Sequence, residues 1–84
     1  MAIRFRRHAK ERMRERGATA LEVMATVLTG SSRPAKFGRL EFRKTFGFGA
    51  RWLGKFYAKK RVEAFVAILP GGDRLVVSVV VKYF

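Results

Sequence analysis

The chain has 84 residues, of which 49% are hydrophobic and 13% aromatic, so residues 1–84 are expected to form one small folded domain. It has no cysteine, which excludes a disulfide framework and a thiolate metal site. Its 19 Lys and Arg residues and 6 Asp and Glu residues give a formal net charge of +13. This charge favours a polyanionic partner: nucleic acid first, then an acidic protein or an anionic membrane surface.

Neither secretion nor membrane insertion is predicted. The first residues, MAIRFRRHAKERM, are basic but lack the apolar stretch of a secretory signal. No apolar run approaches the roughly 20 residues of a transmembrane helix. We therefore expect a cytoplasmic protein with no membrane partner.

The basic residues are unevenly distributed along the chain. Residues 1–16 carry seven basic and two acidic side chains, and residues 31–61 carry ten basic and one acidic. Residues 17–30 and 62–84 together carry only two basic and three acidic side chains. We expect the nearly neutral stretches to supply the core and the basic stretches to form a surface for a polyanion.

Two helices are predicted in the first third of the chain, after a short strand at 3–5. Residues 8–16 favour a helix because Ala, Lys, Glu, Arg and Met have high helix propensity. Gly17 suits the left-handed position that ends this helix. The sequence TALE at 19–22 matches a capping box, which begins a second helix that ends at Gly30.

The second helix is rich in apolar residues. Its predicted buried face consists of Leu21, Met24, Val27 and Leu28, widened by Val23 and Ala25. This helical spacing predicts that the helix is largely buried.

After Pro34 the apolar period changes from 3.6 to 2, which predicts strands. The predicted strands cover 40–46, 51–58, 62–69 and 74–84; the predicted turns are 47–50, 59–61 and 70–73, and 31–34 is a predicted loop. The last strand, RLVVSVVVKYF, is almost continuously apolar, so we expect it to be central and buried on both faces. These elements predict an α+β fold in which an N-terminal helix hairpin packs on one face of a roughly four-stranded antiparallel sheet.

The first candidate for chemistry is His8, the only histidine. An imidazole can act as a general acid or base near neutral pH. Arg12 and Arg16 follow His8 on one helix stripe, where guanidinium groups can hold a phosphate. The alternative is a solvated basic helix with an ordinary histidine. With a single histidine and scattered carboxylates, no metal site and no cofactor are predicted.

The second basic stretch alternates charges with aromatic residues, since seven of the eleven aromatics lie between Phe37 and Tyr57. Basic groups can neutralise phosphates while exposed rings stack on unpaired bases. Strand alternation directs Phe42, Phe46 and Trp52 toward the core, and Phe48 and Tyr57 are the candidates for exposure. The candidate nucleic-acid-binding residues are Arg4, Arg7, Lys10, Arg43, Lys55, Tyr57, Lys59 and Lys60.

Residues 8–30, HAKERMRERGATALEVMATVLTG, resemble the start of a family of small bacterial proteins of unknown function. The residues that match in order and spacing are His8, Ala9, Arg12, Met13, Arg16, Gly17, Glu22, Val23 and Gly30. Ser78, isolated in the apolar segment VVSVVV, corresponds to a hydroxyl residue in the last strand of the family. The family is similar to the RelE-like and barnase-like ribonuclease toxins.

The resemblance implies a RelE-like arrangement of two helices on an antiparallel sheet and a toxin-like endoribonuclease of a toxin–antitoxin or related system. It implies RNA cleavage without a metal ion, through attack of a 2′-hydroxyl on the adjacent phosphate. His8 would be the general acid or base, with Arg12 and Arg16 stabilising the phosphorane-like transition state. Ser78 would orient a reacting group. Two alternatives stay open: a non-catalytic RNA- or DNA-binding module, and a basic protein that binds an acidic partner such as an antitoxin.

Overall fold

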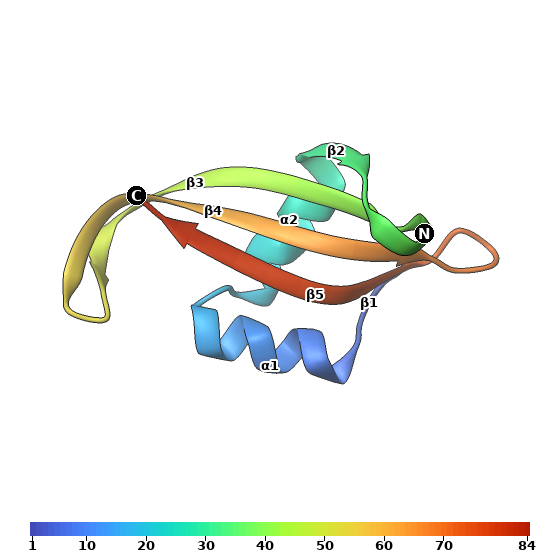
Figure 1. The fold of residues 1–84 in the computed structure, drawn as a ribbon, viewed down its shortest axis with the longest axis horizontal. Helices are drawn as coiled ribbons and strands as arrows, with labels where there is room; N and C mark the ends of the chain where they lie inside the picture. Colours follow the sequence, from blue (N-terminus) through green and yellow to red (C-terminus); the bar gives the residue numbers. More distant parts are fainter.

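The computed structural model describes residues 1–84 and is elongated, measuring 42 × 24 × 22 Å (Figure 1). Its elements in chain order are β1 (Ile3–Phe5), α1 (Arg7–Arg16), α2 (Ala20–Thr29), β2 (Ser31–Pro34), the 3₁₀ turn η1 (Lys36–Gly38), β3 (Leu40–Trp52), β4 (Lys55–Ile68) and β5 (Arg74–Tyr83). No helix is long and apolar enough to cross a lipid bilayer. The long dimension follows β3 and β4, the two longest strands.

The five strands form one mixed sheet in the order β1-β5-β4-β3-β2. The predicted α+β class is confirmed, but the prediction of four antiparallel strands is wrong in three places, two of them at the edges of the sheet. β1 pairs in parallel with β5, with Ile3 opposite Arg74. Residues 31–34, expected as a loop, form the edge strand β2 antiparallel to β3. An edge position tolerates Pro34, because one side of an edge strand needs no hydrogen bonds.

β3 and β4 form a single long hairpin in place of three predicted strands. Its two-residue turn is Leu53–Gly54. The predicted turn at 47–50 is instead a bulge between paired regions, which bends the strand without ending it. The predicted turn at 59–61 lies inside β4, where the three basic residues pair with neighbouring strands like any others.

The two helices begin and end as the local sequence predicts. Thr19 Oγ1 accepts from the Glu22 amide at 3.1 Å, and Glu22 Oε1 accepts from the Thr19 amide at 2.9 Å, which confirms the capping box. Gly17 ends α1 with φ 79°, as predicted. A Cβ atom at this position would lie 2.5 Å from Tyr83 Oη, so the site requires glycine for space as well as for conformation.

One hydrophobic core lies between the helices and the sheet, with α1 packed against β5 and α2 against β4 and β3. Its buried members are Ala9, Met13, Ala18, Val23, Val27, Phe42, Val62, Ala64, Val66, Val76 and Val79, and Phe46 packs against them. β4 is the central strand. β5 lies between β1 and β4, and its Ser78 and Val80 are only half-buried, so the predicted burial of β5 on both faces is wrong.

The predicted buried face of α2 is confirmed at Val23 and Val27 and is wrong at the longer side chains. Leu21 is 79% exposed and Leu28 is 57% exposed, whereas Val23, Thr26 and Val27 are buried. Because α2 is apolar almost all round, hydrophobicity alone selects no face. The structure buries the smaller β-branched residues, which lets α2 lie close to the strands.

The aromatic residues near the end of the hairpin pack around Tyr83. Trp52 stacks on its ring with centroids 5.2 Å apart and an interplanar angle of 15°, and the rings of Phe48 and Tyr57 lie 5.2 and 5.5 Å away. The prediction that Phe48 and Tyr57 are exposed is therefore wrong, since both are half-buried. Strand alternation could not show this, because the hairpin extends beyond the helices and its rings pack against one another.

Polar bonds from the sheet hold the connection between the two helices. Tyr83 Oη donates to the Arg16 carbonyl at 2.6 Å, and burial raises the pKa of Tyr83, so the hydroxyl stays protonated. Lys60 Nζ donates to the Gly17 carbonyl at 2.7 Å and lies 2.8 Å from a Glu22 carboxylate oxygen. These bonds connect the interior of β4 and the end of β5 to the helix hairpin.

Candidate nucleic-acid-binding cleft

The sheet face opposite the helices carries a straight row of four side chains across four strands. Strand register places Arg33 of β2 beside Glu41 of β3, Glu41 beside Phe65 of β4, and Phe65 beside Ser78 of β5. The chain neighbours of Glu41, Phe65 and Ser78 include core residues, so the members of the row point away from the helices. We call this surface the open face.

A cleft of about 670 Å³ lies over this row. Its lining residues are Arg6, His8, Arg33, Pro34, Ala35, Lys36, Phe37, Arg39, Glu41, Phe65, Val77 and Ser78. Glu41, Phe65 and Ser78 belong to the sheet beneath the cleft. Arg6 and His8 come from the start of α1, beyond β5, and the connection between β2 and β3 flanks the other edge.

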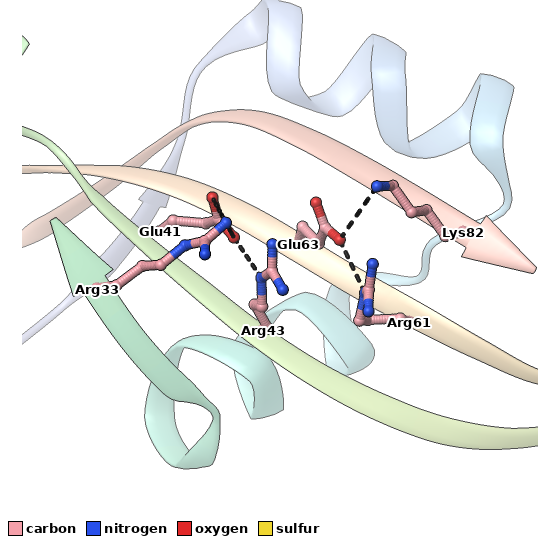
Figure 2. A network of polar contacts seen from close by, with 6 residues as sticks. All are labelled: Arg33, Glu41, Arg43, Arg61, Glu63 and Lys82. Carbon is pink, nitrogen blue, oxygen red and sulfur yellow. Dashed lines mark hydrogen bonds and ion pairs between the residues drawn. The ribbon is translucent and has the colours of Figure 1, made fainter. Parts of the chain in front are cut away.

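The carboxylates of the open face are neutralised by arginines (Figure 2). Glu41 accepts from Arg43 Nε and lies 3.4 Å from Arg33 Nη2. The hydrogen bond from Arg43 holds the pKa of Glu41 below its usual value, against the opposing effect of burial. Glu41 therefore stays ionised and paired, which makes it a poor proton donor and adds no free negative charge to the cleft.

A second carboxylate extends this network along the sheet. Glu63 is adjacent to Arg43 in register and accepts from Arg61 Nε at 2.8 Å, with Lys82 Nζ 4.0 Å away (Figure 2). Four cations thus surround two carboxylates on the open face, the fourth being Arg33. The excess positive charge continues from the cleft along the strands.

Two of the four predicted catalytic residues line the cleft. His8 and Ser78 are separated by most of the chain but line the same space. Arg12 lies outside the cleft, with its Nη1 3.0 Å from a Glu15 carboxylate oxygen. Arg16 is also outside and donates to the Val79 carbonyl at 2.6 Å, so it fastens α1 to β5. Of the helix stripe predicted from spacing, only His8 therefore lines the cleft.

The predicted nucleic-acid-binding residues are scattered over the molecule and none lines the cleft. Lys10, Lys55 and Lys59 are exposed, and Tyr57 packs near Tyr83. Arg4 and Arg7 form surface ion pairs with Asp73 and Glu11 at 3.4 and 3.8 Å, and Arg43 pairs with Glu41. Lys60 is only 4% exposed, and its ammonium group contacts the Gly17 carbonyl and Glu22, so it holds the helix hairpin and presents little surface to a ligand.

The residues that sequence reasoning missed lie mainly in the connection from β2 to β3. Arg33, Lys36, Phe37 and Arg39 all line the cleft. The signal for them was the basic stretch 31–61, but a loop has no periodicity from which the directions of its side chains can be predicted. Comparisons with protein-family models, curated proteins and solved structures found no significant match.

Proposed function

We propose that this protein binds RNA, with the phosphodiester backbone held in the cleft on the open face. The observation that carries this proposal is the charge of the lining: Arg6, Arg33, Lys36 and Arg39 line one cleft together with a single carboxylate, Glu41. Glu41 is itself paired with arginines. A concave basic surface of this kind concentrates a polyanion and releases its counterions on binding.

The distribution of acidic groups supports the same proposal. All six Asp and Glu side chains of the chain take part in ion pairs with Lys or Arg. Arg6, Lys36 and Arg39 have no such ion pair. A phosphate chain entering the cleft thus meets free cations and no free carboxylate.

The test is fluorescence anisotropy of a labelled RNA strand at increasing salt. Three free cations in the cleft predict a slope of log affinity against log salt of about −2, from roughly 0.7 per phosphate contact on a single strand. Between about 50 and 200 mM salt, affinity is then expected to fall roughly 20-fold. Binding that does not change with salt would contradict the proposal.

A pair of charge-matched variants locates the binding site. Arg6→Ala with Lys36→Ala removes two charges from the cleft and is expected to weaken binding and to reduce the slope by about 1.4. Lys55→Ala with Lys59→Ala removes the same charge from exposed positions of the hairpin, outside the cleft. Equal losses in both variants would show that RNA binds the general positive field and not the cleft.

A second candidate function is metal-independent RNA cleavage, as in the toxin-like endoribonucleases that the N-terminal segment resembles. The specific observation in its favour is that His8 and Ser78 line the basic cleft together. His8 would accept the proton of a 2′-hydroxyl as its oxygen attacks the adjacent phosphorus. The bond to the 5′-oxygen would break and that oxygen would take a proton from solvent, which leaves a 2′,3′-cyclic phosphate and a 5′-hydroxyl.

This candidate is tested by incubating labelled RNA with the protein in EDTA. Cleavage is expected to fall at least about 100-fold in His8→Ala, the usual scale for loss of a general acid or base. Arg14→Ala, on the exposed side of α1, is the control and is expected to cleave like the wild type. Intact RNA with the wild-type protein would reject cleavage without affecting the binding proposal.

A further inference from the structure

Phe37 combines an unusual backbone conformation with almost complete exposure. Its φ and ψ are 62° and 32°, in the left-handed region that phenylalanine rarely adopts. The residue is 87% exposed and is not part of the hydrophobic core. The fold therefore accepts backbone strain at Phe37 without gaining buried apolar surface. Strain of this kind is concentrated at functional sites.

The position of Phe37 relates this strain to the cleft. Phe37 lines the cleft, as do its basic neighbours Lys36 and Arg39. The Arg39 guanidinium carbon lies 5.7 Å from the centre of the Phe37 ring, within the range of a cation–π contact. The ring thus lies beside a cation in the lining of a basic cleft, with most of its surface open to solvent.

We infer that Phe37 is a stacking platform for an unpaired nucleobase, and that the cleft selects single-stranded over double-stranded RNA. This inference rests on the proposed RNA binding. An aromatic ring beside phosphate-binding cations is the arrangement that single-strand-binding proteins use, because each base offers a flat face once it is unpaired. In a duplex those faces are already stacked, so a duplex offers the cleft only its backbone and groove edges.

The experiment compares a single strand of about ten nucleotides, within the usual site size, with a duplex of the same length. Anisotropy gives affinity, and 2-aminopurine fluorescence in the strand reports stacking directly. The wild type is expected to prefer the single strand and to quench 2-aminopurine. Phe37→Leu is expected to lose roughly tenfold in affinity for the single strand, the scale of one stacked base, and to lose the quenching, with little change for the duplex. Phe37→Tyr is expected to retain both.

Phe56→Leu is the matched control, because Phe56 is 58% exposed but lies outside the cleft. Phe37→Asn is a second variant that suits the left-handed conformation and is expected to fold at least as well as the wild type. Equal affinity of Phe37→Leu and Phe56→Leu for the single strand would overturn the inference, as would an equal loss on single strand and duplex. Failure of the wild type to bind any RNA at low salt would instead reject the proposed function.

Discussion

Lys60 offers the sharpest test of how the sheet holds the helix hairpin. Its side chain is 6% exposed and lies 2.8 Å from Glu22, which is 23% exposed. Breaking a buried ion pair by removing one partner costs about 3–5 kcal/mol. Because Glu22 keeps some contact with solvent, we expect Lys60→Met, which preserves the length of the stem, to cost about 3 kcal/mol. A domain of 84 residues has a total stability of roughly 4–13 kcal/mol, so this is a large share.

Thermal unfolding followed by circular dichroism measures the effect. A loss of about 3 kcal/mol lowers Tm by roughly 12–24 °C in a domain of this size. Glu22→Gln keeps the capping box, which accepts glutamine, and removes only the charge. The variant that combines Lys60→Met with Glu22→Gln is therefore expected to lose about 1–3 kcal/mol less stability than the two single losses add up to. A Lys60→Met protein with a near wild-type Tm, or strictly additive losses, would refute this account of the pair.

Three further predictions concern stability. Leu53 has φ 51° in a two-residue hairpin turn and is 89% exposed. Because asparagine suits this turn, Leu53→Asn should raise the free energy of unfolding by about 1 kcal/mol in urea titrations. An unchanged free energy of unfolding would contradict this prediction. A Cβ at Gly30 would lie 2.4 Å from the Arg43 carbonyl oxygen, so Gly30→Ala should cost about 3 kcal/mol, whereas Gly47→Ala, with open space, should cost far less. In the folded protein the pKa of Glu41 lies below its usual value near 4.5. The ionised Glu41 therefore stabilises the fold above about pH 4.5, and this contribution is lost as the pH falls through the folded pKa. The decrease of Tm on acidification should be smaller in Glu41→Gln.

The parts of the fold that follow from local chemistry could be predicted from the sequence. Gly17 and the Thr19–Glu22 capping box act within a few residues, and both ends of the helix connection lie where expected. The strand boundaries could not be predicted in the same way. Lys60 looked like a turn residue within a basic triplet, but its partner, the Gly17 carbonyl, is 43 residues away in the sequence. Lys60 meets this partner only in the folded chain, so the local sequence does not indicate that Lys60 lies inside a strand.

The candidate site shows the same division between local and distant information. His8 and Ser78 were each identified from the sequence, and register and topology bring them to one cleft. Arg12 and Arg16 lie outside this cleft, because helix spacing shows which residues share a stripe but not which stripe faces a cleft. The guanidinium of Arg16 instead binds a β5 carbonyl. Phe37 belongs to the predicted aromatic stretch but was not distinguished within it, since its strained conformation becomes visible only in three dimensions.

The net charge of +13 therefore overstates the number of residues available to a polyanion, because some cations serve the fold. Lys60 donates to the Gly17 carbonyl at the end of α1, and Arg74 donates to the Val27 carbonyl in the last turn of α2 at 3.0 Å. A cation at a helix C-terminus pairs with carbonyls that have no partner within the helix and with the negative end of the helix dipole. Both helices thus end on a cation supplied by the sheet. The cations free to bind phosphate are a different set, and within the cleft they are Arg6, Lys36 and Arg39. Removing a structural cation should lower Tm, whereas removing a cleft cation should lower the salt dependence of RNA binding.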